Sequence, residues 1–163
     1  MARKNPSTST TAYYEALATT LAALRALKYV AWNAHWTSRN EWAYGDHLLY
    51  QRIYAGEEDN AVLDEMIDTL GEKLVYLKGD DFIQSPEIVE AYIGIIRSYG
   101  VTPTGRSAAA AVLEMVLICI SHLKSSYTAG QGADMSLGMD DFLMASSNHL
   151  ETFAYLLQQK LRR

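Results

Sequence analysis

Four side chains in the first half of the chain have the types and the spacing that hold a transition metal. His35 lies in "NAHW", and His47 follows twelve residues later in "GDHLL". Asp68 and Glu72 lie four residues apart in "IDTLGEK", so both project from one face of any helix that contains them. A mixed set of imidazoles and carboxylates suits Fe(II), Mn or Zn. Because it is rich in carboxylates, the set indicates redox chemistry on iron more than a structural zinc site.

Each of these residues also has an ordinary explanation when taken alone. A histidine beside tryptophans is most often a hydrogen-bonded residue of a core or an interface. An Asp–Glu pair at this spacing is usually part of a solvated helix face. Only the joint pattern favours a site.

Helices are expected to position all four side chains. Apolar residues recur at steps of three and four from Thr11 to Trp36, which predicts an amphipathic helix with His35 at its end. A second long helix is predicted from near Ala43 to near Lys78, closed by Gly79. It carries His47 and the acidic pair.

Three more helices are expected in the second half of the chain. "SPEIVEAYIGIIRSYG" predicts a short helix with Ser85 as N-cap and Gly100 at its stop. Long helices should run from about Thr104 to Ala129 and from about Gly138 to Leu161. No segment alternates with a period of two as a strand would. The sequence predicts an all-α protein, a four-helix bundle with a short extra helix between the second and third long helices.

Composition indicates one folded domain. The 163 residues are 49% apolar with a formal net charge of −5. We expect a flexible tail over residues 1–10 and the domain over 11–163. The single cysteine, Cys119, excludes an internal disulfide and suits a reducing compartment. The run "AAAAVLEMVLICI" is shorter than the roughly 20 residues that a membrane span needs. The N-terminus lacks the apolar core of a signal peptide. A cytoplasmic protein without a membrane partner is expected.

The order of these motifs resembles the Dps (mini-ferritin) family, within the ferritin-like superfamily. The matching text is "AHW" at 34–36, "DHLLYQR" at 46–52, "IDTLGEKLVYL" at 67–77, the short helix at 86–98 and the final "DDFLMASSNHLETFAYLLQQKL". The resemblance covers almost the whole chain. It is most specific at the first three motifs.

The resemblance implies a hollow homododecamer with a ferroxidase centre at each two-fold interface. His35 and His47 would bind iron from one subunit, and Asp68 and Glu72 from its neighbour. Trp36 would pack beside the centre. Such a protein oxidises Fe(II), commonly with hydrogen peroxide, stores the ferric mineral and protects against oxidative damage.

Two departures from the family pattern keep an alternative open. Gln51 stands where an acid is expected one turn after His47, and the segment from His47 to Glu72 is longer than in the family. A bulge or loop at residues 55–60, where Gly56 and Asn60 weaken the helix, would accommodate the extra length. Three acids could replace the missing charge: Asp46, Glu57 and Glu58. The alternative is a Dps-like shell or DNA-compacting protein with an impaired centre.

Acids around the start of the last helix have two explanations. In the resemblance, Asp134, Asp140 and Asp141 would line iron-conducting pores at the three-fold axes. They are equally well explained as acids that the dipole of the helix N-terminus favours. His122 and His149 match no ligand of the family and are interpreted as structural.

DNA binding, the family's other activity, is expected to be weak or absent. The basic residues at the termini are Arg3, Lys4, Lys160, Arg162 and Arg163. Many copies would add avidity, but a shell of such acidic chains repels phosphate. If DNA is bound, the protein would be associated with the nucleoid.

A classical ferritin or another di-iron carboxylate bundle is disfavoured. Those sites need Glu-x-x-His pairs on two helices. The residues three positions before the four histidines are Trp32, Tyr44, Cys119 and Ser146.

Overall fold

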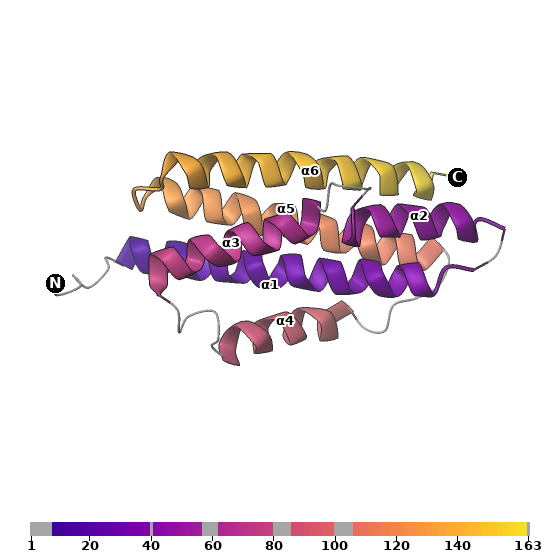
Figure 1. Ribbon diagram of the computed structural model, residues 1–163, viewed down its shortest axis with the longest axis horizontal. Helices are drawn as coiled ribbons and strands as arrows, with labels where there is room; N and C mark the ends of the chain where they lie inside the picture. The colour runs from indigo at the N-terminus through magenta and orange to yellow at the C-terminus, as the bar shows by residue number, and fades with distance from the viewer. Residues whose placement is uncertain (1–7, 40, 57–61, 80–85, 100–105, 163) are drawn as a thin grey trace.

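The computed structural model describes residues 8–39, 41–56, 62–79, 86–99 and 106–162 (Figure 1). Every regular element within these ranges is an α-helix, so the all-α prediction is confirmed. The helices are α1 (Thr8–Trp36), α2 (Ala43–Tyr54), α3 (Val62–Lys78), α4 (Pro86–Tyr99), α5 (Arg106–Gln131) and α6 (Leu137–Leu161).

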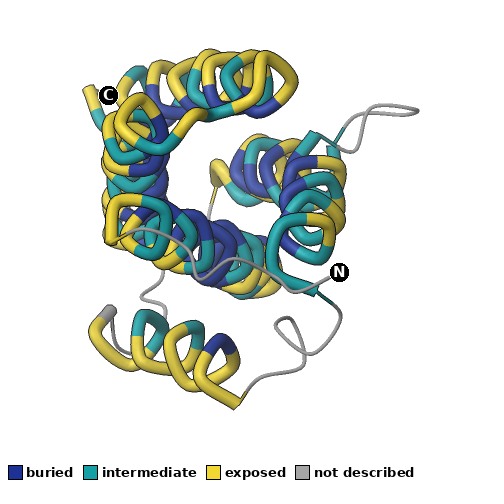
Figure 2. The backbone as a smooth tube through the Cα atoms, turned by 90° about the vertical axis from the view of Figure 1, so that its left-hand side faces the viewer, coloured by how far each residue is buried: buried dark blue, intermediate teal, exposed yellow. Residues whose placement is uncertain are grey.

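The helices form a four-helix bundle with one helix outside it. α1, α5 and α6 run the length of the molecule, and α2 and α3 follow one another along the fourth side (Figure 1). α4 packs on the outer side of α1. Viewed end-on, buried positions face the centre of the bundle, whereas α4 is mostly exposed (Figure 2). The predicted bundle with a short helix before the third long helix is confirmed.

The prediction of one continuous helix from Ala43 to Lys78 is wrong, because α2 ends at Tyr54 and α3 begins at Val62. α2 ends at Tyr54, where the N–H of Ala55 donates to the Gln51 carbonyl at 2.8 Å. Gly56 then takes a φ of 82°, a left-handed conformation that glycine adopts without steric cost and that ends a helix. The predicted interruption at 55–60 is thus confirmed at its first residues. Asn60, the other residue named for it, lies outside the described residues.

The other helix limits differ from prediction by only a few residues. α1 begins at Thr8 instead of Thr11, and residues 1–7 of the predicted tail lie outside the described part of the chain. α6 begins at Leu137 because the Ser136 hydroxyl accepts the Met139 N–H at 3.2 Å, as an N-cap does. α3 closes as predicted at Gly79, with φ 98°. The predicted N-cap Ser85 lies outside the described residues.

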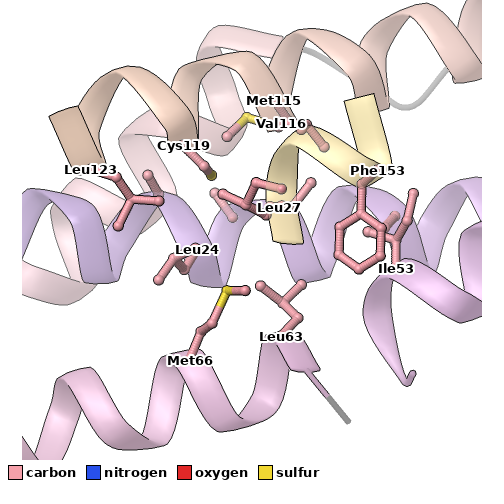
Figure 3. Close-up of a cluster of buried hydrophobic side chains, with 14 of the residues drawn as sticks. Leu24, Leu27, Ile53, Leu63, Met66, Met115, Val116, Cys119, Leu123 and Phe153 are labelled. Carbon is pink, nitrogen blue, oxygen red and sulfur yellow. The ribbon is translucent and has the colours of Figure 1, made fainter. Parts of the chain in front are cut away.

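The core is a continuous apolar cluster between the helices. Leu24 and Leu27 of α1 are fully buried at its centre. Around them lie side chains from the other bundle helices, as Figure 3 shows: Ile53, Leu63, Met66, Met115, Val116, Cys119, Leu123 and Phe153. Burial of a leucine side chain contributes about 1.5–3 kcal/mol. Burial also raises the pKa of the Cys119 thiol, so the thiol stays protonated in the core.

α5 contains a long apolar stretch. By length and composition, residues Ser107–Gln131 could cross a membrane, a test that the core helix of a bundle also passes. Here α5 packs along α1 and α6 and contributes much of the core. The expectation that the chain has no membrane partner stays a prediction.

Candidate metal site

The two predicted histidine ligands lie in contact at one end of the bundle. His35 is in the last turn of α1, and His47 is in the first turns of α2. Their rings stack with centroids 3.5 Å apart and planes inclined by 26°. The intervening turn is held by the hydroxyls of Thr37 and Ser38, which donate to the carbonyls of Asn33 and Ala34 at 2.9 and 3.0 Å. The sequence-predicted pair is therefore brought together.

Each histidine makes a hydrogen bond to the backbone of the other. His35 Nδ1 lies 2.9 Å from the His47 carbonyl oxygen, and His47 Nδ1 lies 3.3 Å from the His35 carbonyl oxygen. A carbonyl only accepts, so each Nδ1 carries a proton and donates it. The His35 carbonyl is among the last of α1, which have no donor within the helix. In the neutral rings both Nε2 atoms then keep the lone pair that binds a metal.

Aromatic rings support the pair on one side. Tyr54 meets the His35 ring edge-on, with centroids 5.1 Å apart and planes at 72°. Trp32 stacks on Tyr54 with ring centroids 5.6 Å apart, and Trp36 packs on Trp32 with ring centroids 4.9 Å apart. The predicted partner Trp36 thus belongs to the aromatic cluster, whereas the tyrosine ring that meets His35 is that of Tyr54. Sequence reasoning missed Tyr54, although it lies two helical turns after His47, on the same face of α2.

The two histidines differ in exposure. His35 is buried, with 9% of its surface exposed, whereas His47 is exposed. Large apolar side chains near the pair in the sequence are also exposed: Tyr29, Trp32, Trp36, Trp42, Tyr44 and Leu48.

The two predicted acidic ligands share one groove. Asp68 and Glu72 are exposed on α3 and line a groove of about 540 Å³ together with Arg25 and Tyr76. The Arg25 guanidinium brings a positive charge to the same groove. No sequence feature singled out Arg25, because the contact of α1 with α3 joins residues far apart in the chain.

The histidines and the acids stay separate within one chain. Among the described residues, no three His, Cys, Asp or Glu side chains gather into a set that could hold a metal. Within one chain the four predicted ligands therefore form two separate pairs, the two histidines and the two acids.

Neither Gln51 nor Asp46, the first acid proposed to compensate for it, supplies a free carboxylate beside the histidine pair. Gln51 is exposed one turn after His47 on α2. Asp46 is 5% exposed, and its Oδ1 forms an ion pair with Nζ of Lys160 in the last turn of α6. Because its charge is bound to Lys160, Asp46 is not free to compensate for Gln51. The other two candidates, Glu57 and Glu58, lie outside the described residues.

The acids near α6 and the remaining histidines are spread over several surfaces. Asp134 is an exposed turn residue with a φ of 57°, and Asp140 is in the first turn of α6, where the helix dipole favours it. Their role in pores stays a prediction, as does that of the exposed Asp141.

Burial lowers the pKa of the half-buried His122. His149 is exposed and lines a smaller groove between α3 and α6.

Comparison with known proteins identifies the architecture. No protein-family model and no curated protein sequence matches the chain. Among solved structures, it is similar to Dps from Microbacterium arborescens in a high-iron form, with a TM-score of 0.75 and 15% identity over 99% of this chain and 100% of that one. The Dps protein from Vibrio cholerae O1 matches with a TM-score of 0.76 and 15% identity over 99% of both chains. Dps from Thermosynechococcus elongatus matches with a TM-score of 0.72 and 17% sequence identity over 95% of both chains.

These similarities extend over nearly the full length of each chain. The Vibrio cholerae protein is described as a member of a broad superfamily of ferritin-like diiron-carboxylate proteins. At 15–17% identity the similarity establishes the fold and not the activity. The chain has the ferritin-like bundle fold of the Dps proteins.

Proposed function

We propose that the chain is a Dps-like ferroxidase and iron-storage shell protein, which oxidises Fe(II), with hydrogen peroxide as the oxidant. Iron is its substrate and its cargo. His35 and His47 of one subunit and Asp68 and Glu72 of a second copy bind the ion. The shell stores the ferric product and protects the cell against oxidative damage.

The observation that carries this proposal is the reciprocal hydrogen bonding of His35 and His47. It selects the neutral tautomer in which both Nε2 atoms are acceptors. A histidine that only packs in a surface cluster does not need this arrangement. A metal-binding histidine is usually held by a donation from its other ring nitrogen to a carbonyl.

A second copy of the chain supplies the remaining ligands. Asp68 and Glu72 are exposed on α3, as residues that bind across an interface must be. The exposed tryptophans around the histidine pair suit a surface covered by another subunit. An isologous two-fold contact would form two such sites at once, because each copy gives its histidines to one and its acids to the other. A closed dodecamer with these two-fold axes is part of the same proposal.

The mixed ligand set suits both oxidation states of the substrate. Imidazole nitrogens bind Fe(II), and carboxylates prefer the harder Fe(III). In the overall reaction two Fe(II) ions lose one electron each. One hydrogen peroxide takes up these two electrons and two protons and gives two water molecules.

A second candidate function follows from the charge of the two half-sites. Gln51 offers a neutral amide one helical turn after His47, and Arg25 adds a positive charge to the groove of Asp68 and Glu72. Both weaken the attraction for a cation. A shell or DNA-compacting protein with an impaired centre is the corresponding alternative. The net charge of −5 argues against strong DNA binding. For either function, a cytoplasmic location, or a nucleoid one if DNA is bound, is part of the proposal.

Ferric absorbance after Fe(II) addition, with and without peroxide, tests the two functions. The native protein should oxidise Fe(II) faster than a protein-free control, and His35→Ala and His47→Ala should lose most of the acceleration. A native rate equal to the control would contradict the ferroxidase. In that case a gel shift at low salt, with a variant lacking the basic C-terminal residues as control, decides whether DNA is bound.

A further inference from the structure

The residue directly before His47 is a buried acid held by the other end of the chain. The Asp46 side chain is 7% exposed and the Lys160 side chain 22%, and Oδ1 of the first pairs with Nζ of the second. Asp46 lies in the first turn of α2, and Lys160 lies in the last turn of α6. Figure 1 shows α2 beside the C-terminal end of α6. The ion pair therefore joins α6 to the turn that carries His47.

α2 has little stability of its own. It contains 12 residues, a length at which an isolated helix is marginal. Its N-cap is Trp42, whose side chain makes no capping hydrogen bond. Gly45 is in its first turn, and glycine costs about 1 kcal/mol relative to alanine in a helix. The position of His47 therefore depends on contacts between α2 and its neighbours.

The surroundings of Asp46 make this contact sensitive to charge. Tyr50, one turn further along α2, is 1% exposed, and its hydroxyl has no hydrogen-bond partner among the described residues. Burial, and after it the charge of Asp46, raises the pKa of Tyr50. The phenol consequently stays neutral and cannot balance a charge on Asp46. Loss of Lys160 would leave a buried carboxylate without its cation, a change that is strongly unfavourable.

We propose that Asp46 and Lys160 are positioning residues for the histidine pair, and that their ion pair keeps the His47 carbonyl within reach of His35 Nδ1. The chain of contacts runs from Lys160 through Asp46 to the adjoining His47 backbone, and from the His47 carbonyl to the ring of His35. The end of α6 thereby controls which nitrogen of His35 is available for a metal. This inference rests on the proposed function, because it concerns the same two ligands.

Four variants separate positioning from mere stabilisation. Lys160→Met removes the cation, and Asp46→Asn with Lys160→Met removes both charges, so that no buried charge is left unpaired. Lys160→Arg keeps the positive charge. Lys28→Met is the matched control, because it breaks the ion pair of Lys28 with Asp64, which joins α1 to α3 outside the histidine pair.

The first measurement is the tautomeric state of the histidines in the metal-free protein, read from nitrogen-15 NMR. The native protein, Lys28→Met and Lys160→Arg should show His35 and His47 as single Nδ1–H tautomers. The double-neutral variant should show a mixture for both, although its unfolding midpoint recovers relative to Lys160→Met. A double-neutral variant that keeps the native tautomers would overturn the proposal. If that variant does not fold, Lys160→Met is compared with Lys160→Arg instead, and native tautomers in Lys160→Met would overturn the proposal.

The second measurement is the binding of Co(II), followed by its visible absorption. The double-neutral variant should bind about 10-fold more weakly than the native protein, the lower range for loss of a residue that orients a ligand. Native affinity in this variant would contradict the positioning role. If the native protein itself binds no Co(II) and oxidises no iron, the proposed function fails. The tautomer comparison still decides the positioning role, because it needs no metal.

Discussion

His35 and His47 donate their Nδ1 protons to each other's backbone carbonyls, at 2.9 and 3.3 Å. Each ring is therefore fixed by the backbone of the other residue and not by a separate acid. The arrangement requires the end of α1 and the start of α2 to lie side by side. Any change that moves one helix end relative to the other alters both ligands together.

Removal of the two acids should affect iron chemistry without affecting the fold. Asp68→Asn with Glu72→Gln keeps the shape of both side chains, and both residues are exposed, so the free energy of unfolding should change by less than about 0.5 kcal/mol. Iron oxidation should fall to near the protein-free rate. Glu65→Gln is the control, because Glu65 is an exposed acid of the same helix that lines the other groove. Equal losses in both variants would point to a general charge effect.

Gln51→Glu should improve the centre. The new carboxylate would lie one turn after His47 on an exposed face of α2, where it adds a negative charge and an oxygen ligand. Co(II) titration should show tighter binding, and Fe(II) oxidation should become faster. A variant that binds no more tightly than the native protein would show that Gln51 does not face the metal in the assembled shell.

Leu27→Ala should destabilise the bundle. Leu27 is fully buried at the centre of the core, and truncation of such a leucine costs about 2–5 kcal/mol. Leu137→Ala is the matched control, because the same truncation is made at a residue that is 88% exposed. Urea unfolding at constant protein concentration measures the difference. Similar losses at both positions would be incompatible with the described core.

Burial of His122 should make the bundle less stable in acid. Burial lowers the pKa of this histidine below its usual 6.5, so as the pH falls the unfolded chain takes up the proton first. The contribution of His122 to stability is fully present above pH 6.5 and is lost as the pH falls through the lower, folded pKa. His122→Gln should therefore show a weaker dependence of unfolding free energy on pH in this acid range. An unchanged dependence would refute the role of His122.

Local patterns were sufficient to predict most of the fold. The apolar positions that predicted the first helix are all fully buried in α1: Leu17, Leu21, Leu24, Leu27, Ala31 and Ala34. Their spacing reports burial directly, because one face of a helix must pack. The interruption after Tyr54 also has a local cause in Gly56. The spacing of residues did not predict that this interruption divides the expected helix into two separate helices, α2 and α3.

Much of the candidate site could not be predicted in this way. The order of the motifs indicated that His35 and His47 belong together, but not that each ring bonds to the other's backbone. Asp46 and Lys160 lie near opposite ends of the folded sequence, and no local sequence pattern around either residue predicts their ion pair. Arg25 joins the acidic groove only through the packing of α1 on α3. Such contacts depend on tertiary structure, which periodicity does not encode.

A subunit-mixing experiment tests most directly whether two copies share one iron site. One variant lacks the histidines (His35→Ala with His47→Ala), and the other lacks the acids (Asp68→Asn with Glu72→Gln). Each alone should be inactive. After joint dissociation and reassembly, each mixed two-fold interface would contain one complete site, so Fe(II) oxidation should return to about a quarter of the native rate. Activity no higher than the sum of the separate variants, in shells shown to contain both, would contradict the shared site.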